Sequence, residues 1–185
     1  PTAEEFLDEV EEGTLADIIY ELGEEVFSKR IARNIVYQRS IKKIKTTGQL
    51  AKIVRDAIPK KKSKIDLATK TFQAIRIYLN DEIKELEKGL ISAEKVLRPE
   101  GRLVVVSFHS IEDRIVKKFF RKCLQNKSMS RHLPELPKKY PSLEILTRKP
   151  ILPSAKEINF NKRSRSAKLR IAKRTHFSST FGEIE

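Results

Sequence analysis

GRLVVVSFHSIEDRIVKKFF, residues 101–120, is the stretch of sequence that decides the fold we expect. Its apolar run at 103–106 predicts a strand buried on both faces, as in a parallel sheet that helices cover on each side. The run ends in the polar cluster 107–110, where a helix with an apolar stripe is expected to begin. Ligands bind at the carboxyl ends of strands in open α/β sheets, so the first place to look for a site is this cluster.

The N-terminal part of the chain shows only helical periodicity. A third helix is expected over residues 24–39, and the apolar spacing over 69–97 predicts one long helix, or two helices with a joint near Asn80. Threonines are the expected N-caps of three helices, at Thr2, Thr14, and Thr46 or Thr47.

Strands are expected only in the second part of the chain. Besides the run at 103–106, residues 143–146 and 167–173 read as strands, the last with alternating apolar and basic residues. We therefore expect an α/β chain with two domains, a helical one over residues 1–75 and a strand-bearing one over residues 76–185.

The charge of the chain points to a polyanionic partner. The net charge is +14, although residues 1–25 hold ten acidic side chains and no lysine or arginine, so the remainder carries +24. A sheet-containing domain this basic favours nucleic acid over a membrane surface. The plainer interpretation is a lysine-rich surface that keeps the chain in solution.

Cysteine usage and hydropathy indicate the cellular compartment and the class of protein to expect. One cysteine, Cys123, excludes an internal disulfide and fits a reducing compartment, and we expect a cytoplasmic protein. No run of about 18 apolar residues occurs, so no membrane span is expected. The three histidines and the cysteine are scattered, without the spacing of a metal site.

Basic side chains that could contact a phosphate backbone gather in two places, and Arg114 on the helix expected after the polar cluster is a further candidate. On the third helix three of them recur at helical spacing and form one patch, and between residues 148 and 174 ten basic side chains meet one acidic one. The predicted backbone contacts are Lys29, Arg30, Arg33, Arg114, Arg163, Arg165 and Arg170.

The polar cluster after the first strand supplies the candidate catalytic residues, Ser107, His109 and Ser110. A Ser–His nucleophile pair is one interpretation, but no G-x-S-x-G turn precedes it and no acid is placed to orient the ring. For Ser110 the favoured role is structural, because Ser110 and Asp113 have the spacing of a capping box.

No nucleotide cradle is encoded in the chain. Its six glycines are far apart, so neither a G-x-G loop nor a P-loop occurs, and three strands make a short sheet. Since the first residue is Pro1 rather than Met, we expect a chain that lacks the first half of its protein.

Four motifs resemble those of the bacterial small-subunit rRNA methyltransferase H family, also called MraW, and follow one another in the order found in that family. One of them is the 101–120 stretch, and the resemblance covers nearly the whole chain. The others are GEEVFSKRIARNIV at 23–36, DLATKTFQAIRIYLNDEI at 66–83 and NKRSRSAKLRIAKRT at 161–175.

The resemblance implies a methyltransferase that moves a methyl group from S-adenosylmethionine to N4 of one cytidine in 16S rRNA. It implies the C-terminal half of a class I, Rossmann-like sheet, preceded by an all-helical insertion domain. The cofactor contacts would lie upstream of Pro1, so no cofactor-binding residue is assigned in this chain. The implied partner is the small ribosomal subunit, and a homodimer is also considered.

Within that resemblance, Ser107, His109 and Ser110 would line the pocket for the base. Phe108 would stack on a flipped base or, as we favour, pack in the core. The alternative is an RNA-binding module without catalysis, and a basic scaffold protein is a third interpretation.

Overall fold

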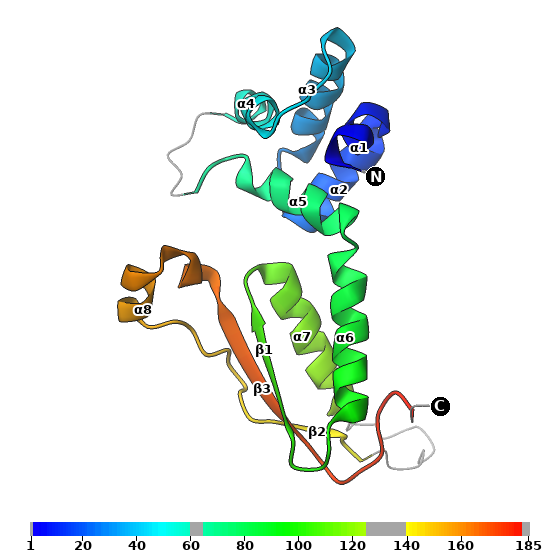
Figure 1. Ribbon diagram of the computed structural model, residues 1–185, viewed down its shortest axis with the longest axis vertical. Helices are drawn as coiled ribbons and strands as arrows, with labels where there is room; N and C mark the ends of the chain where they lie inside the picture. The colour runs from blue at the N-terminus through cyan, green and yellow to red at the C-terminus, as the bar shows by residue number, and fades with distance from the viewer. Residues whose placement is uncertain (1, 60–64, 125–139, 183–185) are drawn as a thin grey trace, which may run out of the picture. The chain divides into compact units, whose positions relative to one another are not determined.

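The computed structural model describes residues 2–59, 65–124 and 140–182 (Figure 1). The chain forms two units, Pro1–Glu82 and Ile83–Glu185, so the division comes somewhat later than the expected one after residue 75.

Unit 1 is built from helices, as its periodicity predicts. The longer ones enclose a core in which Leu15, Ile19, Ile31, Ile35 and Val54 are fully buried. Helix α2 packs against both α3 and α5, and α3 packs against α4. The helices are α1 Ala3–Glu9, α2 Glu12–Gly23, α3 Ser28–Ile41, α4 Thr47–Ala57 and α5 Thr69–Leu79.

Two of the expected caps in unit 1 are confirmed. Thr2 forms a capping box with Glu5, and Thr46 forms one with Gln49. The third is wrong: α2 begins before Thr14, with Glu11 at the N-cap and no side-chain hydrogen bond there.

The third helix begins later than predicted, at Ser28. Glu24 ends α2 in the left-handed region with φ of 51°, and the Glu25 carboxylate accepts a hydrogen bond from the Phe27 backbone N–H at 3.0 Å. These residues therefore form a turn, and Phe27 is 38% exposed at the N-cap of α3.

Unit 2 places two long helices against a small sheet. Helix α5 ends at Leu79 and α6 starts at Glu82, which confirms the joint near Asn80. The elements are α6 Glu82–Val96, β1 Arg102–Ser107, α7 Ser110–Cys123, β2 Leu143–Ile145, α8 Ala155–Phe160, the 3-10 helix η1 Lys162–Ser166, and β3 Lys168–Arg174.

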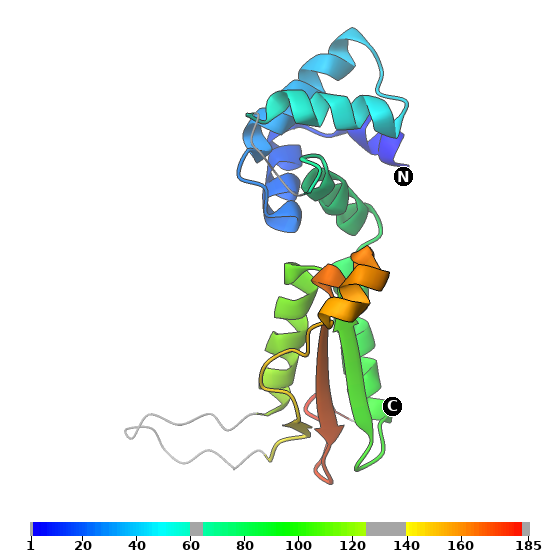
Figure 2. The same ribbon diagram turned by 90° about the vertical axis from the view of Figure 1, so that its left-hand side faces the viewer.

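The sheet has the strand order β1-β3-β2, with both pairs antiparallel. Its three strands lie where the sequence predicts them. Helices α6 and α7 cover one face and enclose a core around Leu90, Phe120 and Leu143, whereas β1 and β3 lie in front of the helices in Figure 2.

The prediction that β1 is buried on both faces in a parallel sheet is wrong for the described residues. Val104 and Val106 are 51% and 48% exposed, because α6 and α7 cover only the face opposite to them. The pairing with β3 places Ile171 beside Val104 and Leu169 beside Val106, so the uncovered face is apolar across both strands.

Candidate functional site

The polar tip between β1 and α7 is held by a capping box that involves His109. The His109 Nδ1 atom accepts a hydrogen bond from the Glu112 backbone N–H at 3.3 Å. In return the Glu112 carboxylate accepts from the backbone N–H groups of Phe108, at 2.8 Å, and His109, at 3.3 Å. The predicted Ser110–Asp113 capping box is therefore wrong: Ser110 is the first residue of the helix.

The cap fixes the chemistry of the His109 ring. Because Nδ1 accepts a hydrogen bond, the neutral ring carries its hydrogen on Nε2. The Nε2 atom is buried and lies 3.3 Å from the Glu112 carboxylate, without hydrogen-bonding geometry to any described residue. His109 therefore combines a structural role at the helix terminus with an N–H group that lacks a hydrogen-bond partner there.

Glu112 stays ionised at this helix terminus. Burial raises the pKa of Glu112, but the nearby His109 ring and the hydrogen bonds from the backbone N–H groups of Phe108 and His109 outweigh burial and leave this pKa below its ordinary value. A carboxylate at the N-terminus of a helix is also favoured by the helix dipole.

The two serines of the tip differ in accessibility. Ser107 is 3% exposed, and its hydroxyl donates to the Lys168 carbonyl oxygen at 3.3 Å. Ser110 is exposed at the start of α7. Phe108, which we expected in the core, is 56% exposed, so its ring is accessible in the described chain.

Arg170 does not belong to the predicted backbone contacts. It is 5% exposed, and its guanidinium donates two hydrogen bonds to the Asp113 carboxylate, from Nε at 2.7 Å and Nη2 at 3.1 Å. These hydrogen bonds hold the pKa of Asp113 below its ordinary value. Since a buried and paired guanidinium is not open to phosphate, we withdraw Arg170 from that set.

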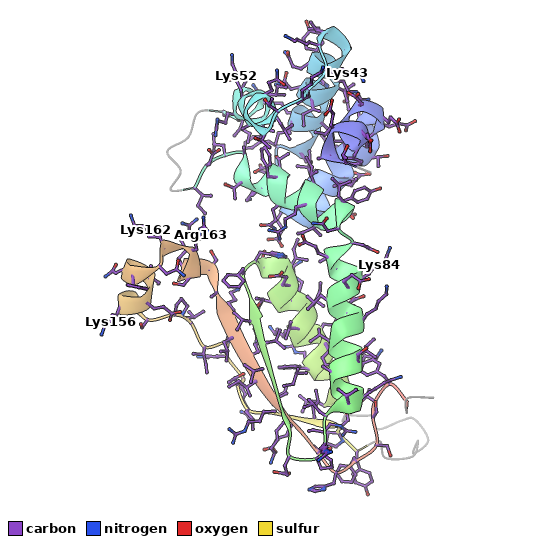
Figure 3. All side chains as sticks on the ribbon, in the orientation of Figure 1. Lys43, Lys52, Lys84, Lys156, Lys162 and Arg163 are labelled. Atoms are coloured by element: carbon purple, nitrogen blue, oxygen red, sulfur yellow. The ribbon has the colours of Figure 1, made fainter. Side chains whose placement is uncertain are left out.

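The other predicted cations are exposed and fall into separate groups in the two units. Arg114 is exposed on α7, and Arg163 and Arg165 are exposed on η1. Figure 3 shows Lys156, Lys162 and Arg163 on α8 and η1. In unit 1, Lys29, Arg30 and Arg33 are exposed on α3.

The patch predicted on α3 is divided by the structure. Arg30 and Arg33 line a groove between α3 and α4, together with Lys52 of α4, whereas Lys29 does not line it. Lys52 was not predicted as part of this patch, because it lies on another helix. The amphipathic spacing of α4 is the only local signal that could have placed it near α3.

Glu94 is a second buried acid, and it was not predicted from the sequence. Glu94 of α6 is fully buried and accepts a hydrogen bond from the Ser179 hydroxyl and one from the Thr180 backbone N–H, at 3.3 Å. The Arg174 Nε atom lies 3.9 Å from Glu94, as an ion pair. Its burial could have been predicted, because Glu94 follows Leu90 by four residues and therefore lies on the inner face of the helix.

Two kinds of chemistry lack support among the described residues. No group of three or more histidine, cysteine or acidic side chains there could hold a metal ion. Burial raises the pKa of Cys123 to about 11, which leaves its thiol protonated and unreactive near neutral pH.

Within the described residues, no helix is both long and apolar enough to span a membrane.

The described residues do not fit S-adenosylmethionine, the cofactor that the resemblance implies. The turn from β1 to α7 contains no glycine, and its two backbone N–H groups already donate to Glu112. The glycines at positions 13, 48 and 89 lie in helices and not in a strand-to-helix turn. No cradle for the cofactor is formed by this part of the chain.

Known proteins resemble this chain over nearly its whole length. The model of the MraW methylase family matches residues 1–175. The ribosomal RNA small subunit methyltransferase H of Rickettsia canadensis (strain McKiel) is 54% identical over 177 residues, which cover 93% of this chain and 57% of the relative. The proteins of the same name from Rickettsia rickettsii (strain Sheila Smith) and Rickettsia bellii (strain RML369-C) are each 52% identical, and the matches cover 57% and 58% of their lengths.

The chain thus spans a little more than half the length of these curated relatives. The family model, by contrast, covers almost all of the chain. The chain belongs to the MraW methylase family.

Proposed function

We propose that this chain serves S-adenosylmethionine-dependent methylation of N4 of one cytidine in the 16S rRNA of the small ribosomal subunit. The observation that carries the proposal is the family match over residues 1–175, with relatives named ribosomal RNA small subunit methyltransferase H. Because the chain spans 57% of such a relative, the activity is proposed for a protein of that length.

The reaction requires the protein mainly to position the N4 amine against the methyl donor. The N4 lone pair of cytosine is delocalised into the ring, so the amine must be held in line with the methyl donor at near-attack distance. An acceptor must also take one N4 hydrogen as the amine changes its bonding. The described residues form no cradle for the donor, so only the RNA side of the reaction is assigned to them.

At the tip of β1 we propose different roles for the three candidates. His109 acts as a positioning residue, because its Nδ1 is engaged by the Glu112 backbone and its Nε2 carries the hydrogen. Ser107 is enclosed and bonded to β3, which supports a structural role. Ser110, which is exposed, is the one whose hydroxyl we propose to face the base.

The uncovered face of the sheet supports the proposal of a larger, Rossmann-like sheet. Val104, Val106 and Ile151 are each about half exposed on that face, and β1 has no second partner strand among the described residues. An apolar face and a free edge are what a strand presents where further strands and helices continue the sheet. We therefore propose that additional strands pair with β1, as in class I methyltransferases.

The test is methylation by the full-length protein that contains these residues. Small subunits that lack the modification are incubated with the protein and methyl-labelled S-adenosylmethionine, and the nucleosides are then separated by mass spectrometry. Label in N4-methylcytidine is expected. Label only in another nucleoside, or none in the presence of RNA binding, would overturn the proposal, and the second result would favour an RNA-binding module without catalysis.

A further inference from the structure

A groove lies between α3 and α4 of unit 1. Its volume is about 800 Å³, within the range of roughly 300–1,000 Å³ that is usual for ligand sites. Side chains of both helices and of the segment between them line it, with Lys52 and Lys43 on view in Figure 3.

The groove is strongly cationic. Five basic side chains and one carboxylate, that of Asp56, line it. Two of these basic side chains form salt bridges with acidic side chains of the N-terminal helices: Lys43 with Asp8, and Arg33 with Glu12 at 3.6 Å. Within the described residues, Arg30, Lys42 and Lys52 have no carboxylate partner, so a multiply charged anion would meet cations that are not already neutralised.

An aromatic ring lies among these cations. Tyr37 is 60% exposed and lines the groove on the same side of α3 as Arg30 and Asn34, which precede it by seven and three residues. An exposed ring in a cationic groove is the arrangement on which unpaired bases stack. A duplex keeps its bases stacked on one another and would make no use of it.

Amide side chains complete the lining. The Asn34 side chain donates to the Ile53 carbonyl oxygen at 2.7 Å, which orients its amide across the groove and leaves the amide oxygen without a partner among the described residues. Gln38 lines the groove one turn further along α3. Amide groups of this kind can both donate to and accept from the edge of an unpaired base.

We propose that the α3–α4 groove binds a single-stranded segment of RNA, with Arg30 and Lys52 on its phosphates and Tyr37 stacked on one unpaired base. The proposal rests on the proposed function, which makes RNA the ligand. It also differs from the predicted basic patch, because it includes Lys52 and Tyr37 and leaves out Lys29, which is exposed and positively charged like Arg30 but lies outside the groove.

Lys29 is therefore the matched control. Binding of the chain to a labelled single-stranded RNA of about 10 nucleotides is measured by fluorescence anisotropy over a range of salt concentrations. Arg30→Gln and Lys52→Gln should each lower the salt slope by about 0.7, whereas Lys29→Gln should leave it unchanged. Tyr37→Ala should weaken binding by about tenfold with the slope unchanged, and Tyr37→Phe should retain binding.

Four results would contradict the proposal that the α3–α4 groove binds single-stranded RNA. One is an equal loss with Lys29→Gln and Arg30→Gln, which would indicate a diffuse basic surface. The others are Tyr37→Ala binding as well as the parent chain, a duplex binding as tightly as the single strand, and a polyglutamate peptide competing as well as RNA. Circular dichroism of each variant shows whether unit 1 remains folded.

The methylation assay separates this proposal from the proposed function. If the groove variants bind RNA normally while the full-length protein still forms N4-methylcytidine, only the proposal of RNA binding by the groove is rejected. If no N4-methylcytidine forms but RNA binding depends on Arg30, Lys52 and Tyr37, the proposed methylation is rejected and RNA binding by the groove is retained.

Discussion

Arg170 of β3 donates two hydrogen bonds to Asp113 of α7, and both side chains are almost completely buried. Arg174 follows Arg170 by four residues on the same face of β3 and forms an ion pair with the buried Glu94 of α6. The inner face of β3 thus presents arginines to the helices, and an acid from each helix neutralises one of them. Polar pairs, as well as apolar contacts, define how α6 and α7 pack on the sheet.

Replacement of Asp113 by Asn should destabilise unit 2. It leaves the Arg170 guanidinium buried without its counter-charge, and the loss of one partner of a buried pair costs about 3–5 kcal/mol. The free energy of unfolding from urea titrations is the measurement. The double variant Asp113→Asn with Arg170→Met, which removes both charges, should recover much of this loss. Equal stability of the two variants would contradict the pairing.

The same pair should make stability depend on pH on the acid side. The pKa of Asp113 is lower in the folded chain than in the unfolded one, chiefly because of Arg170. Its stabilising contribution is therefore fully present above the unfolded pKa of about 3.9, and it is lost as the pH falls through the folded pKa. The midpoint of urea unfolding should fall more steeply below pH 4 for the parent chain than for Asp113→Asn. Parallel curves would argue against this pair as the source.

The His109 cap predicts a smaller effect at the tip of β1. His109→Ala removes the acceptor for the Glu112 backbone N–H and should cost about 1 kcal/mol, whereas His109→Asn keeps a side chain that caps well. Thermal unfolding compares the three chains. A readout beyond stability is RNA methylation by the full-length protein: a positioning role predicts that His109→Asn retains activity, and a proton acceptor at this position predicts that both variants lose it.

Much of the fold could be predicted from the sequence because it depends on local periodicity. The helices of unit 1, the joint near Asn80 and the three strands follow from the spacing of apolar residues. Boundaries were less predictable: α2 begins before Thr14, and the left-handed residue Glu24 delays α3 until Ser28. Both differences arise in turns, where short-range periodicity carries no signal.

Two of the errors at the site arise from contacts that are distant in sequence. Arg170 was predicted to contact phosphate, but its side chain lies on the inner face of β3 and pairs with Asp113, 57 residues away. The apolar run of β1 likewise could not reveal that helices cover only one of its faces. His109 was missed as a cap because histidine is not among the residues that usually occupy that position.

Gly23 should be essential for the packing of α2 on α5, and Gly13 offers a control in the same helix. A Cβ atom at Gly23 would lie 2.7 Å from the Lys70 carbonyl oxygen of α5, a backbone atom that cannot move aside alone, whereas a Cβ atom at Gly13 meets nothing within 4 Å. Gly23→Ala should therefore destabilise unit 1 by about 1–3 kcal/mol through overpacking. Gly13→Ala should be neutral or stabilising by up to about 1 kcal/mol, since alanine is the better helix former. Thermal unfolding followed at 222 nm on the α-helical signal is the measurement, and equal effects of the two substitutions would show that the α2–α5 contact is looser than its geometry indicates.

Glu94 provides the corresponding test on α6, with Glu87 of the same helix as the exposed control. Glu94→Ala removes the acceptor for Ser179 and Thr180 and leaves Arg174 without its acid, so we expect a loss of about 3–5 kcal/mol in the free energy of unfolding. Glu87→Ala should change it by less than about 0.5 kcal/mol. Because Glu94 holds residues 179–180 against α6, limited proteolysis should also cleave the Glu94→Ala chain near that segment before the parent chain. If both variants unfold and are cleaved like the parent, the buried acid does not anchor the C-terminal segment.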